Sequence, residues 1–308
     1  MGKRNKKGDA VHGWINVDKP IGITSTQVIG KIRRFLNAQK VGHAGTLDPL
    51  ASGVLPIALG EATKTIPYMQ DAMKSYQFTV TFGEQRSTDD AEGEILAKSD
   101  NRPTQQRIEA ALPTFMGDIT QVPPKYSAIK IDGQRAYDLA RQGEVVEIKE
   151  REVYIERLEL LFCDKDTARF EVVCGKGTYV RSIARDLALS LGTYGYVSAL
   201  RRTSVGAFHA EDAILLDNLE KMDHIAAREA ALLPLQVVLD DIPALEIKAN
   251  EVTKLRNGNA LPLISKADFQ RLEALGDIDE ALAIFQGQAV ALVHIEGPQV
   301  QPFRVFNF

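Results

Sequence analysis

The clearest hydrophobic patterns along the chain predict single helices mixed with alternating strands. In residues 25–37 apolar side chains recur every three or four positions, which predicts an amphipathic helix with a basic outer face. Residues 178–192 repeat that pattern. Residues 75–83 instead alternate strictly, with Tyr76 and Phe82 on the same apolar face, as in a half-buried antiparallel strand.

Further strands are predicted without a regular strand–helix repeat between them. They cover residues 14–17, 53–60, 144–163, 168–177 and 199–208. Residues 125–143 predict a strand, an Asp-Gly turn and a short helix. Runs of strands separated by single helices are typical of an α+β fold. We therefore expect a mixed, mainly antiparallel central sheet with flanking helices.

The composition changes near residue 211. Residues 211–242 are acidic and predicted to be mostly helical. Beyond them come a strand, a short helix, a helical stretch near 266–284 and two more strands. This order predicts a small, strand-rich C-terminal domain, of roughly the smallest size that folds alone. The expected division is a basic flexible tail over 1–12, a catalytic domain over 13–242 and a C-terminal domain over 243–308.

Charge is distributed unevenly over the 308 residues. The net charge is −4, but residues 1–50 hold nine Lys or Arg against three Asp, a net charge of +6. Such a basic region can bind a polyanion, because binding follows the local potential. A solvated terminus explains the lysines of residues 3–7 equally well. With neither a signal peptide nor a long apolar run, a cytoplasmic protein is expected.

Common cofactor and metal motifs are missing from the sequence. Cys163 and Cys174 form no CxxC pair, and the five histidines have no HxxxH or HExxH spacing. There is no GxxxxGK[ST] loop, and the stretch at 175–180 lacks the third glycine of a dinucleotide fingerprint. Neither a metal nor a nucleotide cofactor is therefore expected.

A single carboxylate stands in the small-residue stretch GHAGTLDPLASG, residues 42–53. Asp48 precedes Pro49, which favours an extended backbone, and the surrounding glycines let a ligand approach closely. Such an Asp can act as a nucleophile or a base. An Asp before Pro also commonly starts a turn, and on this stretch alone the turn is the simpler interpretation.

Six segments together resemble, in order and spacing, the bacterial TruB family of tRNA pseudouridine synthases. They are VDKPIGITS, KVGHAGTLDPLASGVLPIALGEATK, YQFTVTFGEQRSTDDAEG, PPKYSAIKIDGQRAYDLAR, GTYVRSIARDL and LRRTSVGAF. The resemblance spans about residues 13–209 and implies isomerisation of uridine 55 in the T-loop of tRNA to pseudouridine, without a cofactor. More loosely, residues 243–308 resemble the RNA-binding PUA domain of that family.

The resemblance implies roles for the residues nearest the reacting base. Asp48 matches the catalytic Asp, which attacks either the base or the sugar carbon, and Arg181 matches the Arg that pairs with it. Tyr76 matches the aromatic residue that stacks on the flipped uracil and Tyr179 a second tyrosine of the pocket. Either phenol could shuttle a proton. Leu200 matches an apolar wall.

Further matches imply contacts with the RNA. His43 matches a residue that enters the T-loop and helps to hold the target base outside the stack, and Thr46 is expected to contact the substrate from the same loop. Lys19 and Lys64 are expected to contact phosphates, and Asp90 matches a position near the substrate. The exposed face with Arg33 and Arg34 is a further candidate for phosphate contacts, and Tyr196 departs from the family pattern.

Two other functions remain open at this point. An RNA-binding module without catalysis would use the basic helix and the C-terminal domain equally well, but it would not need Asp48, Tyr76 and Arg181 together. A small-molecule enzyme with a lone Asp is disfavoured by the basic N-terminal region. The expected partner is the T-stem-loop of tRNA, and the expected state is a monomer without an obligate protein partner.

Overall fold

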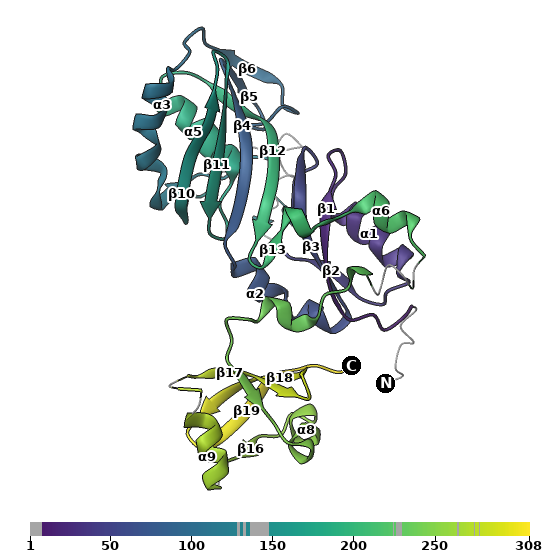
Figure 1. Ribbon diagram of the computed structural model, residues 1–308. Coiled ribbons are helices and arrows are strands. Elements are labelled where there is room, and N and C mark those ends of the chain that lie inside the picture. The colour runs from purple at the N-terminus through teal and green to yellow at the C-terminus, as the bar shows by residue number, and fades with distance from the viewer. Residues whose placement is uncertain are drawn as a thin grey trace.

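The computed structural model describes residues 8–127, 130–131, 134–135, 148–223, 225, 230–263, 265–273, 275–276 and 278–308. Within these residues the strands form a ten-stranded central sheet, a five-stranded C-terminal sheet and two short hairpins (Figure 1). No helix in the described ranges is long and apolar enough to cross a membrane.

The central sheet is mixed and mainly antiparallel, as the sequence predicts. Its order is β14-β1-β3-β12-β4-β11-β10-β7, with β2 paired to β3 and β13 to β12. Its parallel pairs are β1 with β14 and β3 with β12. The strands are β1 (Gly13–Lys19), β2 (Val41–His43), β3 (Ala51–Leu59), β4 (Lys74–Phe82), β7 (Gly117–Gln121), β10 (Arg151–Cys163), β11 (Thr167–Cys174), β12 (Gly195–Val205), β13 (Phe208–His209) and β14 (Ile214–Leu215).

Helices pack on the sheet at both of its ends. Figure 1 shows α3 (Gln105–Ala111) and α5 (Val180–Ser190) beside β4, β10 and β11, and α1 (Ser25–Phe35) and α6 (Leu216–Lys221) beside β1. Thr24 caps α1, as its hydroxyl accepts a hydrogen bond from the Gln27 amide. The 3₁₀ turn η1 (Gly60–Thr65) and α2 (Ile66–Asp71) connect β3 to β4, and η2 (Leu112–Phe115) follows α3.

Strand β12 brings three sequence motifs together. It is longer than the strand predicted from residue 199, because it begins at Gly195. Its neighbours are β3 on one side and β4 on the other, so that Leu200 lies beside Ala51 and Phe78. Two residues on, Arg202 lies beside Gly53 and Tyr76. The strands that follow the Asp48 loop and carry Tyr76 therefore meet at β12.

The C-terminal sheet corrects one sequence expectation. Its order is β15-β17-β18-β19-β16. The predicted helical stretch over 266–284 is wrong in its second half, because residues 280–285 form the inner strand β17. A strand buried on both faces does not alternate, which hides it in the sequence. The elements are β15 (Ala244–Glu246), α8 (Ala249–Arg256), β16 (Leu261–Pro262), α9 (Lys266–Glu273), β17 (Glu280–Phe285), β18 (Gln288–Glu296) and β19 (Gln299–Val305).

Two other predictions are only partly matched. In the described part of 211–242, residues 225, 230 and 231 are helical, η3 (Ala210–Asp212), α6 and η4 (Leu235–Val238) are short, and β14 adds a strand. Around the predicted Asp-Gly turn, β8 (Lys130–Ile131) pairs with β9 (Gln134–Arg135), whereas the turn at 132–133 and the predicted helix after it lie outside the described residues. The second small hairpin joins β5 (Glu84–Arg86) to β6 (Ile95–Lys98).

The two sheets share an apolar cluster and polar contacts. Trp14 and Phe208 of the central sheet belong to the same buried cluster as Leu292 of β18 and Phe306, which follows β19. Lys64 of η1 donates a 2.7 Å hydrogen bond to the Val305 carbonyl. Val305, near the C-terminal end of the chain, is thus hydrogen-bonded to η1, the turn that follows β3.

Candidate active site

A cleft of about 650 Å³ opens where the Asp48 loop faces β4, β12 and the start of α5. Gly45, Thr46, Leu47 and Asp48 form one wall, and the segment from Gly175 to Arg181 forms another. Tyr76, Leu200 and Arg202 line it from the sheet. With Arg151 and Glu152 of β10, the cleft gathers residues from five segments of the chain.

The Asp48 loop is held at both ends by hydrogen bonds. The Leu47 amide donates to the Ser25 hydroxyl at 2.9 Å, and that hydroxyl donates to the Leu47 carbonyl at 3.1 Å. On the other side of Asp48, the Gly22 amide donates to the Pro49 carbonyl at 2.8 Å. The loop is therefore fixed against the first turn of α1 and the segment before it, and the carboxylate between these anchors is directed by the fold.

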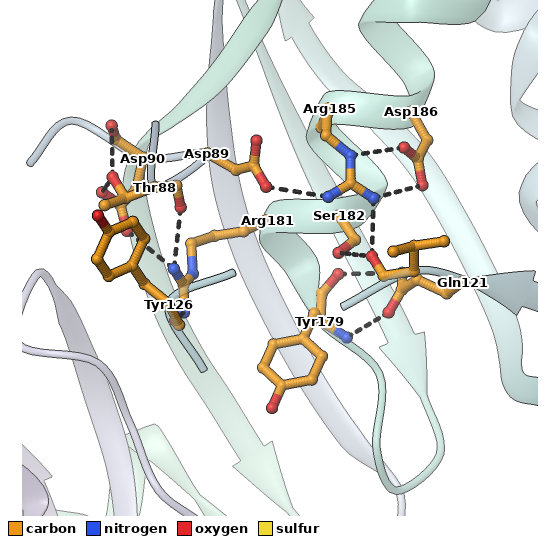
Figure 2. Close-up of polar contacts among 11 residues, drawn as sticks. Thr88, Asp89, Asp90, Gln121, Tyr126, Tyr179, Arg181, Ser182, Arg185 and Asp186 are labelled. Atoms are coloured by element: carbon orange, nitrogen blue, oxygen red, sulfur yellow. Dashed lines mark hydrogen bonds and ion pairs between the residues drawn. The ribbon is translucent and has the colours of Figure 1, made fainter. Parts of the chain in front are cut away.

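Asp48 forms an ion pair with Arg181. An Arg181 Nη2 to Asp48 Oδ2 distance of 2.9 Å joins them across the cleft, and the Asp48 side chain is 36% exposed. The same guanidinium lies 3.3 Å from Asp90 and donates to the carbonyls of Thr88 (2.9 Å) and Tyr126 (3.0 Å), as Figure 2 shows for the residues drawn. Four oxygens thus fix the orientation of one arginine, which matches its planar set of donors.

Tyr76 and Leu200 form an apolar wall of the cleft. Both side chains are 9% exposed, on adjacent strands. Burial raises the pKa of the Tyr76 hydroxyl, and the nearby positive charge of Arg202 opposes this effect. The phenol therefore stays protonated at neutral pH. Tyr76 is thus part of the apolar face of its strand and also lines the cleft.

Arg202 is a residue that the sequence did not single out. Arg202 is 1% exposed. Its Nε donates a 2.7 Å hydrogen bond to the Val54 carbonyl, and its Nη2 donates a 3.2 Å hydrogen bond to the Gly45 carbonyl. It therefore ties β3 to the start of the Asp48 loop. The neighbouring Arg201 turns the other way and pairs with Asp18 at 2.7 Å. Strand alternation predicts one of two adjacent arginines inside, but the usual exposure of arginine argues against burying either.

Asp90 lies behind Arg181 and not in the cleft wall. Its side chain accepts hydrogen bonds from the Thr88 hydroxyl and, at 3.0 Å, from the Glu92 amide. Burial raises the Asp90 pKa, an effect opposed by Thr88 and Arg181. Asp90 is not among the residues that line the cleft and adjoins it through Arg181, so the expected place near the substrate stays a prediction.

Lys19 does not fit the expected phosphate contact. Its side chain is fully buried, and Nζ donates to the carbonyls of Pro20 at 2.9 Å and Ile23 at 2.8 Å. Burial lowers the pKa of Lys19 to about 8, while Asp48 opposes the shift. An ammonium with no exposed surface cannot contact RNA, so Lys19 instead supports the backbone between β1 and α1.

Lys64 is engaged by the protein itself. Its Nζ lies 2.6 Å from Glu61 Oε2 and 2.7 Å from the Val305 carbonyl, with the side chain 26% exposed. The predicted phosphate contact would compete with both partners, and it stays a prediction.

Of the three other predicted substrate contacts, Thr46 and Tyr179 line the cleft and His43 does not. Thr46 is exposed at the rim of the cleft. Tyr179 lines the cleft, with the Arg151 guanidinium 4.8 Å from its ring centroid. His43 ends β2, and burial together with Arg202 lowers its pKa, so the imidazole is neutral at pH 7.

The described residues offer no evident metal site. No group of three His, Cys, Asp or Glu side chains among them is arranged to hold an ion.

The fold defines the class of protein. The chain superposes on the solved Cbf5-Nop10-Gar1 complex with a TM-score of 0.71, at 26% identity over 96% of this chain and 85% of that one. The archaeal box H/ACA sRNP Nop10-Cbf5 complex gives a TM-score of 0.69 at 25% identity, covering 99% and 93%. This is the pseudouridine synthase fold, with a PUA-like C-terminal unit.

Sequence comparison shows the family. Residues 33–180 match the N-terminal domain of the TruB family pseudouridylate synthases, and residues 181–242 match the tRNA pseudouridylate synthase B C-terminal domain. A tRNA pseudouridine synthase B from Rhodospirillum rubrum is 48% identical over 99% of both chains, and one from Paracoccus denitrificans is 50% identical over 98% of both. The chain belongs to the TruB family of pseudouridine synthases.

Proposed function

We propose that the protein converts uridine 55 in the T-loop of tRNA to pseudouridine, with Asp48 as the nucleophile. The observation that carries the proposal is the Asp48–Arg181 ion pair at the wall of a cleft that Tyr76 and Leu200 also line. A carboxylate that lies beside apolar walls and is paired with an arginine suits attack on a neutral base or sugar. The names of the relatives support tRNA as the substrate.

Arg181 would keep Asp48 reactive after the substrate enters. A nucleobase in the cleft excludes water, and a carboxylate that loses its water without gaining a partner is costly. The arginine 2.9 Å away provides that partner and aims the carboxylate. Four partners hold the guanidinium in place, so little reorganisation is needed when the base arrives.

The isomerisation balances without any co-reactant. The bond between N1 of uracil and C1′ of the ribose breaks, the uracil turns, and a bond between C5 and C1′ forms. The proton lost from C5 is matched by one gained at N1, so that atoms and electrons are conserved. Asp48 would assist by attacking either the base or C1′, and the hydroxyl of Tyr76 or Tyr179 would shuttle the proton.

The target base must leave the T-loop stack before it can reach Asp48. Unstacking costs a few kcal/mol, which contacts in the cleft must offset. The Tyr76 ring would stack on the extruded uracil, and Leu200 would complete the apolar wall. His43 would occupy the vacated position, which suits a neutral imidazole, since a stacked site disfavours a buried charge.

Binding of the T-stem-loop would rely on the basic N-terminal region and on the C-terminal unit. Arg33 and Arg34 are exposed on α1 and are available to phosphates. We propose that residues 13–242 act as the catalytic domain and residues 243–308 as an RNA-binding domain of a monomer.

The proposal is tested with an unmodified tRNA transcript that carries tritium at C5 of its uridines. Release of one tritium per tRNA without added cofactor, lost when uridine 55 is replaced by cytidine, is the expected result. Asp48→Asn should abolish release and retain tRNA binding. Asp166→Asn is the matched control, since Asp166 pairs with Arg102 on the surface, and it should retain full activity.

Two outcomes would overturn the proposal in different ways. Binding of tRNA without tritium release by the parent protein would identify an RNA-binding module. Release that persists in Asp48→Asn would exclude Asp48 as the nucleophile.

A further inference from the structure

Two consecutive carboxylates meet two arginines that lie one helical turn apart. In α5, Arg181 and Arg185 lie on the same helix face, as residues four apart do. Arg181 pairs with Asp90 at 3.3 Å, and Arg185 pairs with Asp89 at 3.0 Å. Figure 2 shows Asp89 between the two arginines, with the Arg185 contact on the side away from Asp90.

We propose that the Asp89–Arg185 pair is a positioning device that sets the orientation of Arg181 toward Asp48. Arg185 is not among the residues that line the cleft, so it would act only through other residues. This inference rests on the proposed function for its catalytic consequence, and its structural consequence can be measured without turnover.

The carbonyls that orient Arg181 belong to two segments that Arg185 anchors. Arg181 donates to Thr88, which precedes Asp89, and to Tyr126. Arg185 reaches the first segment through Asp89, and it reaches the second by donating 2.8 Å from Nη2 to the Val122 carbonyl. The Arg185 side chain thus anchors the two segments whose carbonyls accept from Arg181. Asp89 is one residue from Thr88, and Val122 is four residues from Tyr126.

The backbone of Asp89 has an unusual conformation and is itself bound to the sheet. Asp89 has a φ of +59°, a left-handed conformation that non-glycine residues adopt rarely and that Asp and Asn tolerate best. Its carbonyl accepts from the Val197 amide of β12 at 3.0 Å. The Asp89 backbone is therefore tied to the sheet and its side chain to α5, so the turn that carries Thr88 and Asp90 is held between the two layers.

A second contact reinforces the other segment. The Ser182 hydroxyl donates 2.8 Å to the same Val122 carbonyl that Arg185 contacts. Both donors come from the first turns of α5, next to Arg181. The position of Val122 relative to α5 is thus doubly fixed, and Tyr126 follows it in the chain.

Asp186 provides the matched control. It accepts from Arg185 Nε at 2.8 Å and from Nη2 at 3.2 Å, but both residues belong to α5. Its contact with Arg185 therefore ties the helix only to itself. Removing its charge should leave the links from Arg185 to Asp89 and Val122 in place.

The experiment compares Arg185→Gln, Asp89→Asn, the double variant and Asp186→Asn. Asn keeps the left-handed conformation accessible at position 89 while removing the charge. Single-turnover pseudouridine formation at saturating enzyme is measured with tRNA binding and thermal unfolding. We expect each single variant to lose about 10- to 100-fold in rate, as small displacements of a catalytic group do, with tRNA affinity within about twofold of the parent.

The double variant distinguishes a shared contact from two independent effects. Because both substitutions remove the same link, the double variant should be no slower than the slower single variant. Asp186→Asn should stay within about twofold of the parent. Multiplied losses in the double variant, or full rates in a folded Arg185→Gln protein, would overturn the inference.

Hydrogen–deuterium exchange separates this inference from the proposed function. In Arg185→Gln, peptides covering residues 84–94 should exchange faster than in the parent, whereas Asp186→Asn should leave them unchanged. An inactive parent with faster exchange in Arg185→Gln would refute the proposed function and keep the anchor. Unchanged exchange would refute the anchor, whatever the activity of the parent.

Discussion

The ion pair between Arg181 and Asp48 is asymmetric: the arginine side chain is 4% exposed and the aspartate side chain 36%. The cation is thus fixed inside the protein, while the carboxylate faces the cleft. Such an arrangement leaves one carboxylate oxygen available to a substrate without freeing the charge of the arginine. The position of the Arg181 guanidinium, and with it the orientation of Asp48, therefore depends on the groups that surround Arg181.

Arg181→Lys should separate charge from geometry. Lysine keeps the positive charge, but a single ammonium cannot reproduce contacts with Asp48, Asp90 and two carbonyls at once. We expect a loss of about 100-fold in the single-turnover rate with tRNA affinity nearly unchanged. Rapid-quench pseudouridine assays beside filter binding check this. A rate within threefold of the parent would show that charge alone suffices.

Gly53→Ala should destabilise the fold beneath the Asp48 loop. Gly53 has a φ of +102°, and an added Cβ would lie 2.1 Å from the Arg202 carbonyl oxygen. We expect a loss of about 3 kcal/mol in the free energy of unfolding, from steric overlap and backbone strain. Denaturant titration measures this loss.

A matched glycine lies in α1. Gly30 has no neighbouring atom within 4 Å of an added Cβ, so Gly30→Ala should stabilise by about 0.5–1 kcal/mol. Equal effects of the two substitutions would contradict the close approach of β3 and β12 at Gly53.

The sequence predicts elements well where one face is buried and the other solvated. The alternation around Tyr76 and the helical period around Val28 appear in the structure as β4 and α1. The strand β17 was missed because Ala281, Leu282 and Ala283 are all buried, which removes alternation, and Ala and Leu also favour helices.

The sequence predicts those residues of the candidate site that belong to the six segments resembling the family in order and spacing. Asp48, Tyr76 and Arg181 come together at one cleft, as the resemblance implies. Lys19 and Arg202 could not be placed from sequence, because local pattern does not reveal which buried carbonyls a cation will satisfy. Lys19 donates to the Ile23 carbonyl and Arg202 to the Val54 carbonyl, and it is the folded backbone that places these carbonyls beside the two cations.

The unfolding free energy should depend on pH through Lys19. Burial lowers the folded pKa of Lys19 to about 8 from an ordinary 10.5. Below pH 8 both states bind the proton. Between about 8 and 10.5 the unfolded state binds more protons than the folded state, so stability rises with pH in that window.

Lys19→Met should remove this contribution. The unfolding free energy of the parent minus that of the variant should increase from pH 7 to pH 10, as denaturant titrations at each pH measure. Lys74 has a pKa lowered to about 8 by burial as well, but it is present in both proteins and cancels in the difference. Parallel stability curves would show that Lys19 keeps an ordinary pKa.

Lys64→Met tests whether this lysine contacts phosphate or fastens the two sheets together. A lost phosphate contact reduces the slope of log affinity against log salt by about 0.9 for duplex and 0.7 for single-stranded nucleic acid. Because Lys64 Nζ is held by Glu61 and the Val305 carbonyl, we expect the slope to stay that of the parent and the thermal unfolding midpoint to fall. Arg34→Met, on the exposed face of α1, should instead reduce the slope and leave the midpoint unchanged. A reduced slope in Lys64→Met would show that the lysine leaves its partners for the RNA, as the sequence analysis expects.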